Sequence, residues 1–528
     1  MPTNRGYHIR MTKMPFSVSR PSIARLLGTL ATGSMIATPL LAQVAPPPVM
    51  VPTTPPQAQP PAAQPQVVPP ATVQPLPQAA PAVAIPPLSE AQARQLATLI
   101  AQGEVAQGLR QGPPRDLSTL STLSPAALTR VALDYAHAVH VGRLDAADFT
   151  KDWGIRPQPY DPAPGFAEAV RHDRLSAWIA SLPPPYAGYD ALVKGLARYR
   201  AMAAAGGWSS LPAATINFGA SGPQVLALRK RLAMEDPAVS ATGERFDDDL
   251  LAAVRRAQRR YGLNPVGTVG SQTIAVLNVP VAQRIRQIMA NMERWRWLPQ
   301  QLEAKRVQVN IAAAVLTVFD GDNPVMSMKA VTGRPGNETP MLVSTIRSIV
   351  LNPPWNVPSS IANKELWPKE RANPGYLKRA GFRVIDNGDG SKRLQQSSEK
   401  SALGRYKFDF PNDFAVYLHD TPAQSGFSKF DRLASHGCVR LEKPADLASL
   451  MLKTTPEWQQ PQIDAVIASG KTVRATMAEP VAVYLLYWTA FANADGQVGF
   501  REDPYSWDAQ LAAKIEARSA ERAQATKD

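Results

Sequence analysis

The sequence has very little cysteine and, over its first 89 residues, no acidic residue. Cys438 is the only cysteine among 528 residues, so no disulfide can form within the chain. Asp and Glu are absent before Glu90, and the five charged residues before the apolar run at 26–41 are all basic. That run contains Gly, Thr, Ser and Pro and is too short and mixed for a typical membrane span.

Residues 1–42 are predicted to be an export signal. Basic residues precede the apolar run and small residues follow it at Ala42. An uncleaved signal that anchors the protein at the inner membrane is the alternative. Exported proteins normally carry cysteines in pairs, and a single thiol is open to oxidation in that compartment. Retention of Cys438 therefore favours a chemical use for its thiol.

The remaining composition indicates a globular body behind a linker. Residues 43–88 consist largely of Pro, Ala, Gln and Val, which favours an extended, hydrated segment. The formal charge of +14 favours anionic surroundings. The chain has no zinc-finger spacing, no helix-turn-helix pattern and no dense Lys/Arg run, so we expect no nucleic acid partner.

After the linker, the sequence changes from helix-forming to strand-forming residue patterns. Ser89 and Gln92 form a capping-box pattern, whereas Val307, Val309 and Ile311 alternate as in a strand. We expect a multidomain α+β protein with these parts: a helical scaffold at 89–210, a helical module at 211–279, a connecting helix at 280–305, a β-rich domain at 306–480 with an insertion at 353–404, and a C-terminal hairpin and helix at 481–528.

Two histidines on one predicted helix, His137 and His140, have the spacing of metal ligands, but no third ligand is evident. A solvated or packed pair is the simpler interpretation. We expect neither a metal nor an organic cofactor.

The stretch 416–441 contains the groups needed to attack a carbonyl. Cys438 supplies a thiol, His419 precedes it by nineteen residues and can act as its base, and Gly437 allows a tight turn that aims backbone amides at an oxyanion. Residues 439–441 read as a buried strand that would hold the nucleophile. The structural alternative makes Cys438 a small buried hydrophobe and both local histidines satisfied loop residues.

His419 and the run Ser435-His436-Gly437-Cys438-Val439-Arg440 resemble the signature of the L,D-transpeptidase (YkuD) catalytic domain. Further motifs resemble its large YcbB-type branch: 291–299, 352–358, 402–405 and 417–422. The resemblance implies a mixed β-sandwich-like catalytic domain, with the insertion as a lid over the site. Residues 211–279 resemble a three-helix peptidoglycan-binding module, with a purely structural module as the alternative.

The resemblance implies a periplasmic enzyme that cross-links peptidoglycan stem peptides, on glycan strands, through a thioester on Cys438. His419 would be the base, and Ser435, His436 and Gly437 would form the oxyanion loop. Arg440 would bind a stem carboxylate or form a structural ion pair, and Tyr417 and Trp355 are further pocket candidates. We expect a 3-3 linkage, with a 1-3 linkage as the alternative. The sequence identifies no protein partner.

Two other functions fit the same residues less well. Water could resolve the thioester, which would give an L,D-carboxypeptidase or a cysteine peptidase that hydrolyses stem peptides. However, NlpC/P60-type peptidases place Cys before His in the chain, and here His419 comes first. A non-catalytic wall-binding scaffold is the third interpretation, and the intact pair of His419 and Cys438 argues against it.

Overall fold

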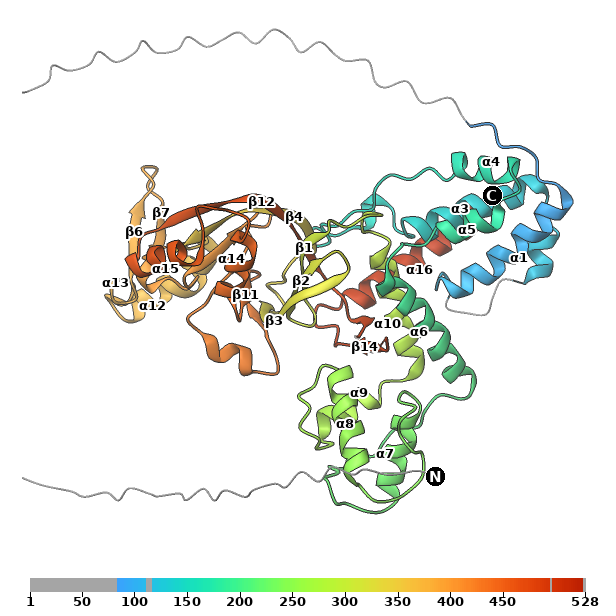
Figure 1. Cartoon of the computed structure of the whole chain (residues 1–528), viewed down its shortest axis with the longest axis horizontal. Coiled ribbons are helices and arrows are strands. Elements are labelled where there is room, and N and C mark those ends of the chain that lie inside the picture. Colours follow the sequence, from blue (N-terminus) through green and yellow to red (C-terminus); the bar gives the residue numbers. More distant parts are fainter. Residues whose placement is uncertain (1–82, 111–115, 494–495, 526–528) are drawn as a thin grey trace, which may run out of the picture. The chain divides into compact units, whose positions relative to one another are not determined.

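The computed structural model describes residues 83–110, 116–493 and 496–525 (Figure 1). The predicted signal at 1–42 and most of the predicted linker at 43–88 lie outside these ranges. No helix in the described ranges is long and apolar enough to cross a membrane.

The first part of the described chain is helical, as predicted. The capping box is present: Ser89 Oγ accepts from the N–H of Gln92, and the Gln92 side chain accepts from the N–H of Ser89. The elements are α1 (Glu90–Ala106), α2 (Leu117–Ser121), α3 (Pro125–His140), η1 (Ala146–Asp148), α4 (Ala163–Arg171), α5 (Leu175–Ser181) and α6 (Ala187–Ala204).

The paired histidines at the end of α3 lie in packed surroundings. The His140 ring stacks on Tyr160 with ring centroids 3.9 Å apart, and its Nδ1 lies 3.0 Å from the carbonyl oxygen of Leu182. Burial lowers the pKa of His140. Among the described residues no three His, Cys, Asp or Glu side chains are grouped as metal ligands.

The next helices form the small module and its connection. Their bounds are α7 (Pro223–Ala233), α8 (Asp248–Arg260), α9 (Ser271–Leu277) and α10 (Val281–Trp295). A buried carboxylate, Glu235, accepts from Tyr261 within the module and pairs with Arg231 at 2.8 Å. Trp295 and Trp297 are buried, and Trp295 stacks on Trp488 at 4.5 Å, as expected for packing anchors.

The second half is built on a nine-stranded mixed sheet with the order β10-β3-β11-β9-β8-β4-β12-β1-β2. The long strand β3 pairs with β2 along its first part and with β11 near its end, so the ladder closes on itself. The strands are β1 (Lys305–Asn310), β2 (Val315–Asp320), β3 (Asn323–Gly333), β4 (Leu342–Leu351), β8 (Tyr406–Asp409), β9 (Leu418–His419), β10 (Leu433–Ser435), β11 (Val439–Leu441) and β12 (Val473–Leu486).

Strand β12 runs through the predicted boundary between residues 480 and 481. It pairs with β4 on one side and with β1 on the other, so it is a central strand of the sheet. Proline removes a ladder donor and usually ends a strand. Here Pro480 lies where the register with β4 shifts, between Thr476 and Val481, so the irregularity accommodates it.

The C-terminal hairpin is therefore shorter than predicted. The partner of β14 (Val498–Phe500) is β13 (Ala490–Ala492), and not the strand at 481–489. Between β11 and β12 the chain forms α14 (Pro444–Leu452) and α15 (Gln460–Ser469). After the hairpin, α16 (Trp507–Ala525) packs on α10.

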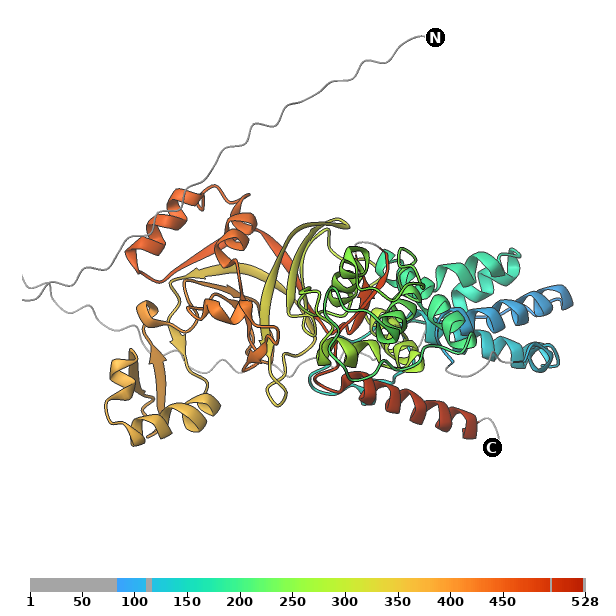
Figure 2. The ribbon, with the colours of Figure 1, turned by 90° about the horizontal axis from the view of Figure 1, so that it is seen from below.

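The insertion at 353–404 has a small hydrophobic core of its own, separate from the core of the sheet. This small core includes Leu366, Phe382 and Leu394. Figures 1 and 2 show it as a distinct group of elements beside the strands. Its elements are β5 (Trp355–Asn356), α11 (Ser359–Ile361), the π-helical turn η2 (Ala362–Leu366), α12 (Trp367–Ala372), α13 (Tyr376–Arg379), β6 (Phe382–Asp386), β7 (Lys392–Gln396) and η3 (Ser398–Lys400).

The two ends of the insertion meet at one fixed point. Asn352 donates its backbone N–H to the carbonyl of Arg405 at 2.8 Å, and its side-chain amide donates to the carbonyl of Val466 at 2.8 Å. Asn352 adopts a positive φ of 47°, which Asn tolerates better than most residues. The insertion is thus attached to the sheet through a rigid base.

Candidate active site

The register of three short strands gathers the polar groups of the predicted site on one face. In the parallel pair β9–β11, Val439 lies opposite Leu418 and Arg440 lies opposite His419. Val439 and Leu418 are fully buried in the core below the sheet. Because side chains alternate along a strand, Cys438 and Arg440 lie on the other face together with His419. The sequence pattern alone could not supply this register.

Cys438 lies half-buried at the start of β11. Its thiol lies 3.9 Å from the carbonyl oxygen of Ala415, which can accept only from a protonated sulfur. Burial raises the pKa of the thiol, and hydrogen bonds from the backbone and side chain of Tyr417, with the charge of Lys407, oppose this shift. The Cys438 sulfur is therefore a neutral thiol at neutral pH.

His419 is buried, and its orientation is set by its own backbone. Its Nδ1 contacts the carbonyl oxygen of Asp420. Since a carbonyl only accepts, Nδ1 carries the proton and Nε2 is left as the base. The Asp420 carboxylate points elsewhere and accepts from the N–H groups of Arg405 at 2.7 Å and Thr421 at 2.6 Å. A backbone carbonyl therefore orients His419, whereas Ser435 Oγ bonds the backbone of its own loop.

Burial and the positive charge of Arg440 lower the pKa of His419 to about 3. At neutral pH the imidazole is therefore uncharged. A neutral imidazole beside a neutral thiol can take the thiol proton only as the attack proceeds, which is general-base catalysis and not a preformed ion pair.

Ser435 shapes the loop that carries the nucleophile. Its Oγ donates to the carbonyl of Cys438 at 2.5 Å and accepts from the N–H of Gly437 at 3.1 Å. The carbonyl of Gly437 accepts from Thr339 Oγ1 at 2.7 Å. Gly437 has φ of +113°, which L side chains rarely adopt, so the expected glycine turn is present. The N–H of Gly437 is already occupied, so the oxyanion role predicted for this amide is not available in this conformation.

His436 points toward the insertion. Its Nε2 lies 2.6 Å from Glu365 Oε1, in the π-helical turn, and 3.3 Å from a guanidinium nitrogen of Arg334. Arg334 and Glu365 are themselves 3.9 Å apart. We call these three side chains the clasp. The clasp joins the loop before Cys438 to the insertion, which is a different role from the predicted oxyanion contact.

The cations beside the nucleophile differ in their partners. Lys407 lies opposite His419 in the β8–β9 pair and forms an ion pair with Asp409 at 2.6 Å. In the described part of the chain no carboxylate lies within 4.0 Å of the guanidinium of Arg440. The structural ion pair considered for Arg440 is therefore not formed, and its charge stays available on the face that holds Cys438.

Two aromatic side chains complete the face. The Tyr417 ring meets the His419 ring edge-on at 5.6 Å, and Lys407 Nζ lies 4.4 Å from the Tyr417 ring centroid. The Tyr417 hydroxyl also bonds the Trp355 side chain from the insertion, and burial keeps its pKa raised. Tyr417 and Trp355, the two weaker pocket candidates, thus lie together with the cysteine.

Sequence reasoning did not identify Lys407, Glu365 or Arg334. The polar and apolar alternation of β8 was a usable signal for Lys407, because Tyr406 and Phe408 are buried. Glu365 lies on a surface turn of the insertion, and no local pattern relates it to His436, 71 residues away.

Comparison with known protein families gives three separate matches along the chain. Residues 304–462 match the L,D-transpeptidase catalytic domain (YkuD), and residues 88–196 match a family described as Scaffold domain. Residues 221–277 match the family "Putative peptidoglycan binding domain". The stretch with Cys438 and His419 falls inside the first match.

A Haemophilus influenzae protein named "Putative L,D-transpeptidase" is 31% identical over 242 residues, which cover 43% of this chain and 49% of the relative. Among solved structures, an L,D-transpeptidase from Stackebrandtia nassauensis is 15% identical, covers 53% of this chain and 97% of its own, and gives a TM-score of 0.23. An L,D-transpeptidase from Xylanimonas cellulosilytica is 16% identical, and the match covers 53% of this chain and 98% of that structure, with a TM-score of 0.18. By the family matches, residues 304–462 form a catalytic domain of the L,D-transpeptidase (YkuD) family, preceded by a scaffold-domain match at 88–196 and a match of the peptidoglycan-binding type at 221–277.

Proposed function

We propose that this protein is a peptidoglycan L,D-transpeptidase in which Cys438 is the nucleophile and His419 the general base. The observation that carries the proposal is the β9–β11 register, which puts the only thiol and a neutral, oriented imidazole on one face of the sheet. The family match supports the reaction class.

The reaction follows from the protonation states. As the Cys438 sulfur bonds to the carbonyl carbon of a stem peptide, its proton passes to His419 Nε2. The tetrahedral intermediate collapses, the C–N bond breaks, and His419 returns the proton to the leaving D-alanine amine. An amine of a second stem peptide then attacks the thioester, which forms the new amide and frees the thiol.

Two further groups support the intermediate and its substrate. Since Gly437 donates its N–H to Ser435, the N–H of Cys438 itself is our candidate oxyanion donor. Arg440 supplies a guanidinium for a stem carboxylate, because Arg matches carboxylate geometry in a bidentate way. The insertion, tied to the loop by the clasp, would keep water from the thioester. That exclusion favours an amine over water as the acceptor.

The proposed location of the reaction is the cell wall, which the protein would reach by export. The basic start of the chain and the apolar run at 26–41 support export to the periplasm, with an inner-membrane anchor if the signal stays uncleaved. The match at 221–277 supports contact with peptidoglycan. We propose a linkage through the third residue of both stems (3-3), with attack at the first residue (1-3) as the alternative product.

The test is intact-mass spectrometry of the protein with a disaccharide-tetrapeptide, followed by analysis of the muropeptide products. We expect a thioester adduct and a cross-linked dimer, whose fragmentation identifies the linkage. Because the chain has a single cysteine, any thioester adduct is on Cys438. Cys438→Ser should lose adduct and dimer while keeping the wild-type circular dichroism spectrum.

His419→Gln should lower the rate of adduct formation at least about 100-fold, the lower end of general-base contributions. The matched control is His172→Gln, since His172 is exposed and pairs with Glu168 on α4. Cross-linking by the Cys438→Ser variant would refute the mechanism. Release of free D-alanine without dimer would make the protein a carboxypeptidase instead.

A further inference from the structure

A hollow of about 390 Å³ lies at the start of β10, between the small module and the sheet. Its walls come from three regions: residues 261–263 after α8, residues 312–315 in the β1–β2 turn, and residues 430–433 together with Arg501. Leu433, the first residue of β10, belongs to this wall. The hollow is thus separate from the face that holds Cys438 but on the strand that leads to it.

The first cation of this hollow is Arg432. It is half-buried and donates only to backbone carbonyls: Nε to Ala330 at 3.2 Å, and one terminal nitrogen to Ala313 at 3.1 Å. Burial lowers its pKa. Carbonyl oxygens satisfy the N–H groups, and the carboxylates of Glu442 and Asp431 act on the positive charge only from beyond 4.0 Å.

The second cation is Arg501, directly after β14. It donates to the carbonyls of Arg260 at 3.1 Å and Phe500 at 2.6 Å. Burial, with repulsion from Arg432, lowers its pKa to about 10. A Cβ on Gly262 would lie 2.6 Å from Arg501 Nε, so the missing side chain at residue 262 makes room for this arginine. The fold therefore holds two like charges around one hollow.

Neither arginine has an anionic partner within the protein. In the ranges that the structure describes, no carboxylate oxygen lies within 4.0 Å of either guanidinium. Asp431 and Glu502 also line the hollow, but both are exposed at its rim. Cations withdrawn from water are normally paired, so two half-buried arginines that face one hollow without a carboxylate at ion-pair distance indicate an external anion.

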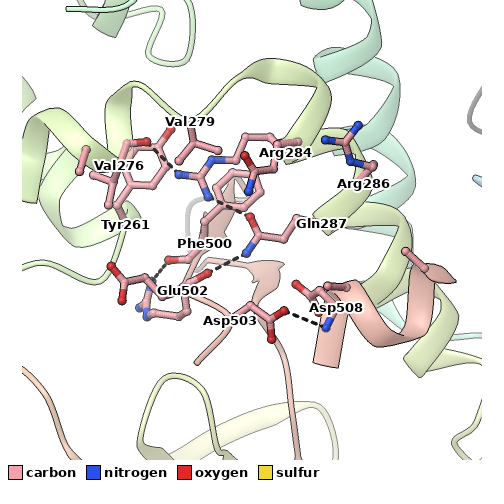
Figure 3. Close-up of a pocket in the computed structure, with 15 residues that line it drawn as sticks. Tyr261, Val276, Val279, Arg284, Arg286, Gln287, Phe500, Glu502, Asp503 and Asp508 are labelled. Carbon is pink, nitrogen blue, oxygen red and sulfur yellow. Dashed lines mark hydrogen bonds between the residues drawn. The ribbon is translucent and has the colours of Figure 1, made fainter. Parts of the chain in front are cut away.

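A larger neighbouring hollow, of about 530 Å³, is lined by Arg284 and Arg286 besides Arg501 (Figure 3). It shares Tyr261, Arg501 and Glu502 with the first. Its arginine Arg284 donates to Gln287 and to the carbonyl of Val276, both at 2.8 Å, and stacks on buried rings. Its carboxylate Asp503 accepts from Trp507 and Asp508 N–H groups. The terminal nitrogens of Arg284 thus have neutral partners within this hollow, while its buried Nε has no hydrogen-bond partner among the described residues.

We propose that Arg432 and Arg501 form a binding site for a carboxylate of a peptidoglycan stem peptide, outside the catalytic face. This proposal rests on the proposed function. From Arg432 to Ser435 the chain advances three strand residues, or about 10 Å, and an extended tetrapeptide spans about 13 Å. A stem held by its carboxylate in the hollow can therefore reach the loop that carries Cys438. The net charge of +14 favours such an anionic ligand.

The test uses the full chain with Cys438→Ser, so that no thioester forms, and a titration with disaccharide-tetrapeptide. A second probe has all carboxyl groups converted to amides. Arg432→Gln or Arg501→Gln should weaken binding of the first probe roughly 10-fold, a typical loss for one charge-assisted contact. Neither change should alter binding of the amide probe.

Because both arginines also hold backbone carbonyls, a variant that leaves them in place is needed. Glu502→Gln removes a rim carboxylate that makes no hydrogen bond or ion pair within the described structure. It should strengthen binding of the acidic probe about 2-fold to 3-fold by removing repulsion, and leave the amide probe unchanged. The matched control is Arg286→Gln, an exposed arginine of the larger hollow, which should bind both probes like the parent.

Equal loss of affinity in Arg286→Gln and Arg432→Gln would overturn the proposal, because the effect would then reflect overall charge. Unchanged affinity in Arg432→Gln and Glu502→Gln would also overturn it. Failure of the proposed function has a different signature. If wild-type Cys438 gives no adduct with a carbapenem, the mechanism fails, whereas the titrations with Cys438→Ser still report on the hollow.

Discussion

At the scale of single residues, the site is governed by what burial does to two titratable groups. Cys438 is kept as a thiol and His419 as an imidazole, and the Nδ1 contact with the Asp420 carbonyl decides which nitrogen is the base. An imidazole that stays neutral suits a general base. The same burial makes folding depend on pH.

The pKa of His419 is about 3 in the folded protein and its ordinary value is 6.5. Between these values the unfolded chain binds a proton that the folded protein does not, so the free energy of unfolding falls as pH drops below about 6.5. Each pH unit in that window costs about 1.4 kcal/mol. Between pH 7 and pH 5, we expect the free energy of unfolding of wild type to fall by about 2 kcal/mol more than that of His419→Gln. Urea unfolding at the two pH values measures this difference.

The control for this comparison is His172→Gln, which changes an exposed histidine and should keep the wild-type dependence on pH. If His419→Gln and wild type lose the same free energy over this range, the imidazole is not held neutral by burial.

At the scale of elements, the clasp couples the insertion to the nucleophile loop. The insertion has its own core and a fixed base at Asn352, so it can move as one piece about that base. Glu365, in a π-helical turn, reaches across to His436, two residues before Cys438. Such turns inside helices often mark functional positions.

We expect Glu365→Gln to weaken the clasp and let water reach the acyl-enzyme more often. Hydrolysis of a carbapenem adduct should rise several-fold, and amide hydrogens of β6 and β7 should exchange faster. Stability should change by less than about 1 kcal/mol, because the pair is partly exposed. Glu399→Gln is the matched control, since it removes the same charge from an exposed position of the insertion. Equal hydrolysis in both variants would show that the clasp does not guard the thioester.

The elements also show what the sequence could predict. Cys438, His419 and Gly437 stand within one short stretch, and their roles follow from residue type and local turn preference. The partners of that stretch come from strand register and from the insertion, and contacts such as Glu365 with His436 have no local sequence signal. The boundary predicted after residue 480 falls inside β12, because an irregular register accommodates Pro480 within the strand, and the sequence does not show this.

At the scale of the whole molecule, the sheet depends on the last fifth of the chain. β12 lies between β4 and β1, so a chain that ends at the predicted boundary, residue 480, keeps only the β4 pairing of residues 473–476 and loses all pairing with β1. The lost part includes the fully buried Val483, Tyr484 and Leu485.

We expect the chain truncated after residue 480 to lose its cooperative thermal transition and its carbapenem adduct. Removal of several fully buried side chains costs more than the free energy of unfolding of a typical domain. Truncation after residue 525 is the control and should melt like wild type. A folded, acylatable product from the 480 truncation would mean that β12 can be replaced by other pairing.

The pairing of β1 with β12 also sets the order in which the enzyme can assemble. β1 meets its antiparallel neighbour β2 within a few residues, but its parallel neighbour arrives about 170 residues later along the chain. Ribosomes make proteins from the N-terminus, so Cys438 is synthesised before the strand that completes the sheet around it. We therefore expect the nascent chain to carry Cys438 without acylating activity until residues 481–486 have been synthesised.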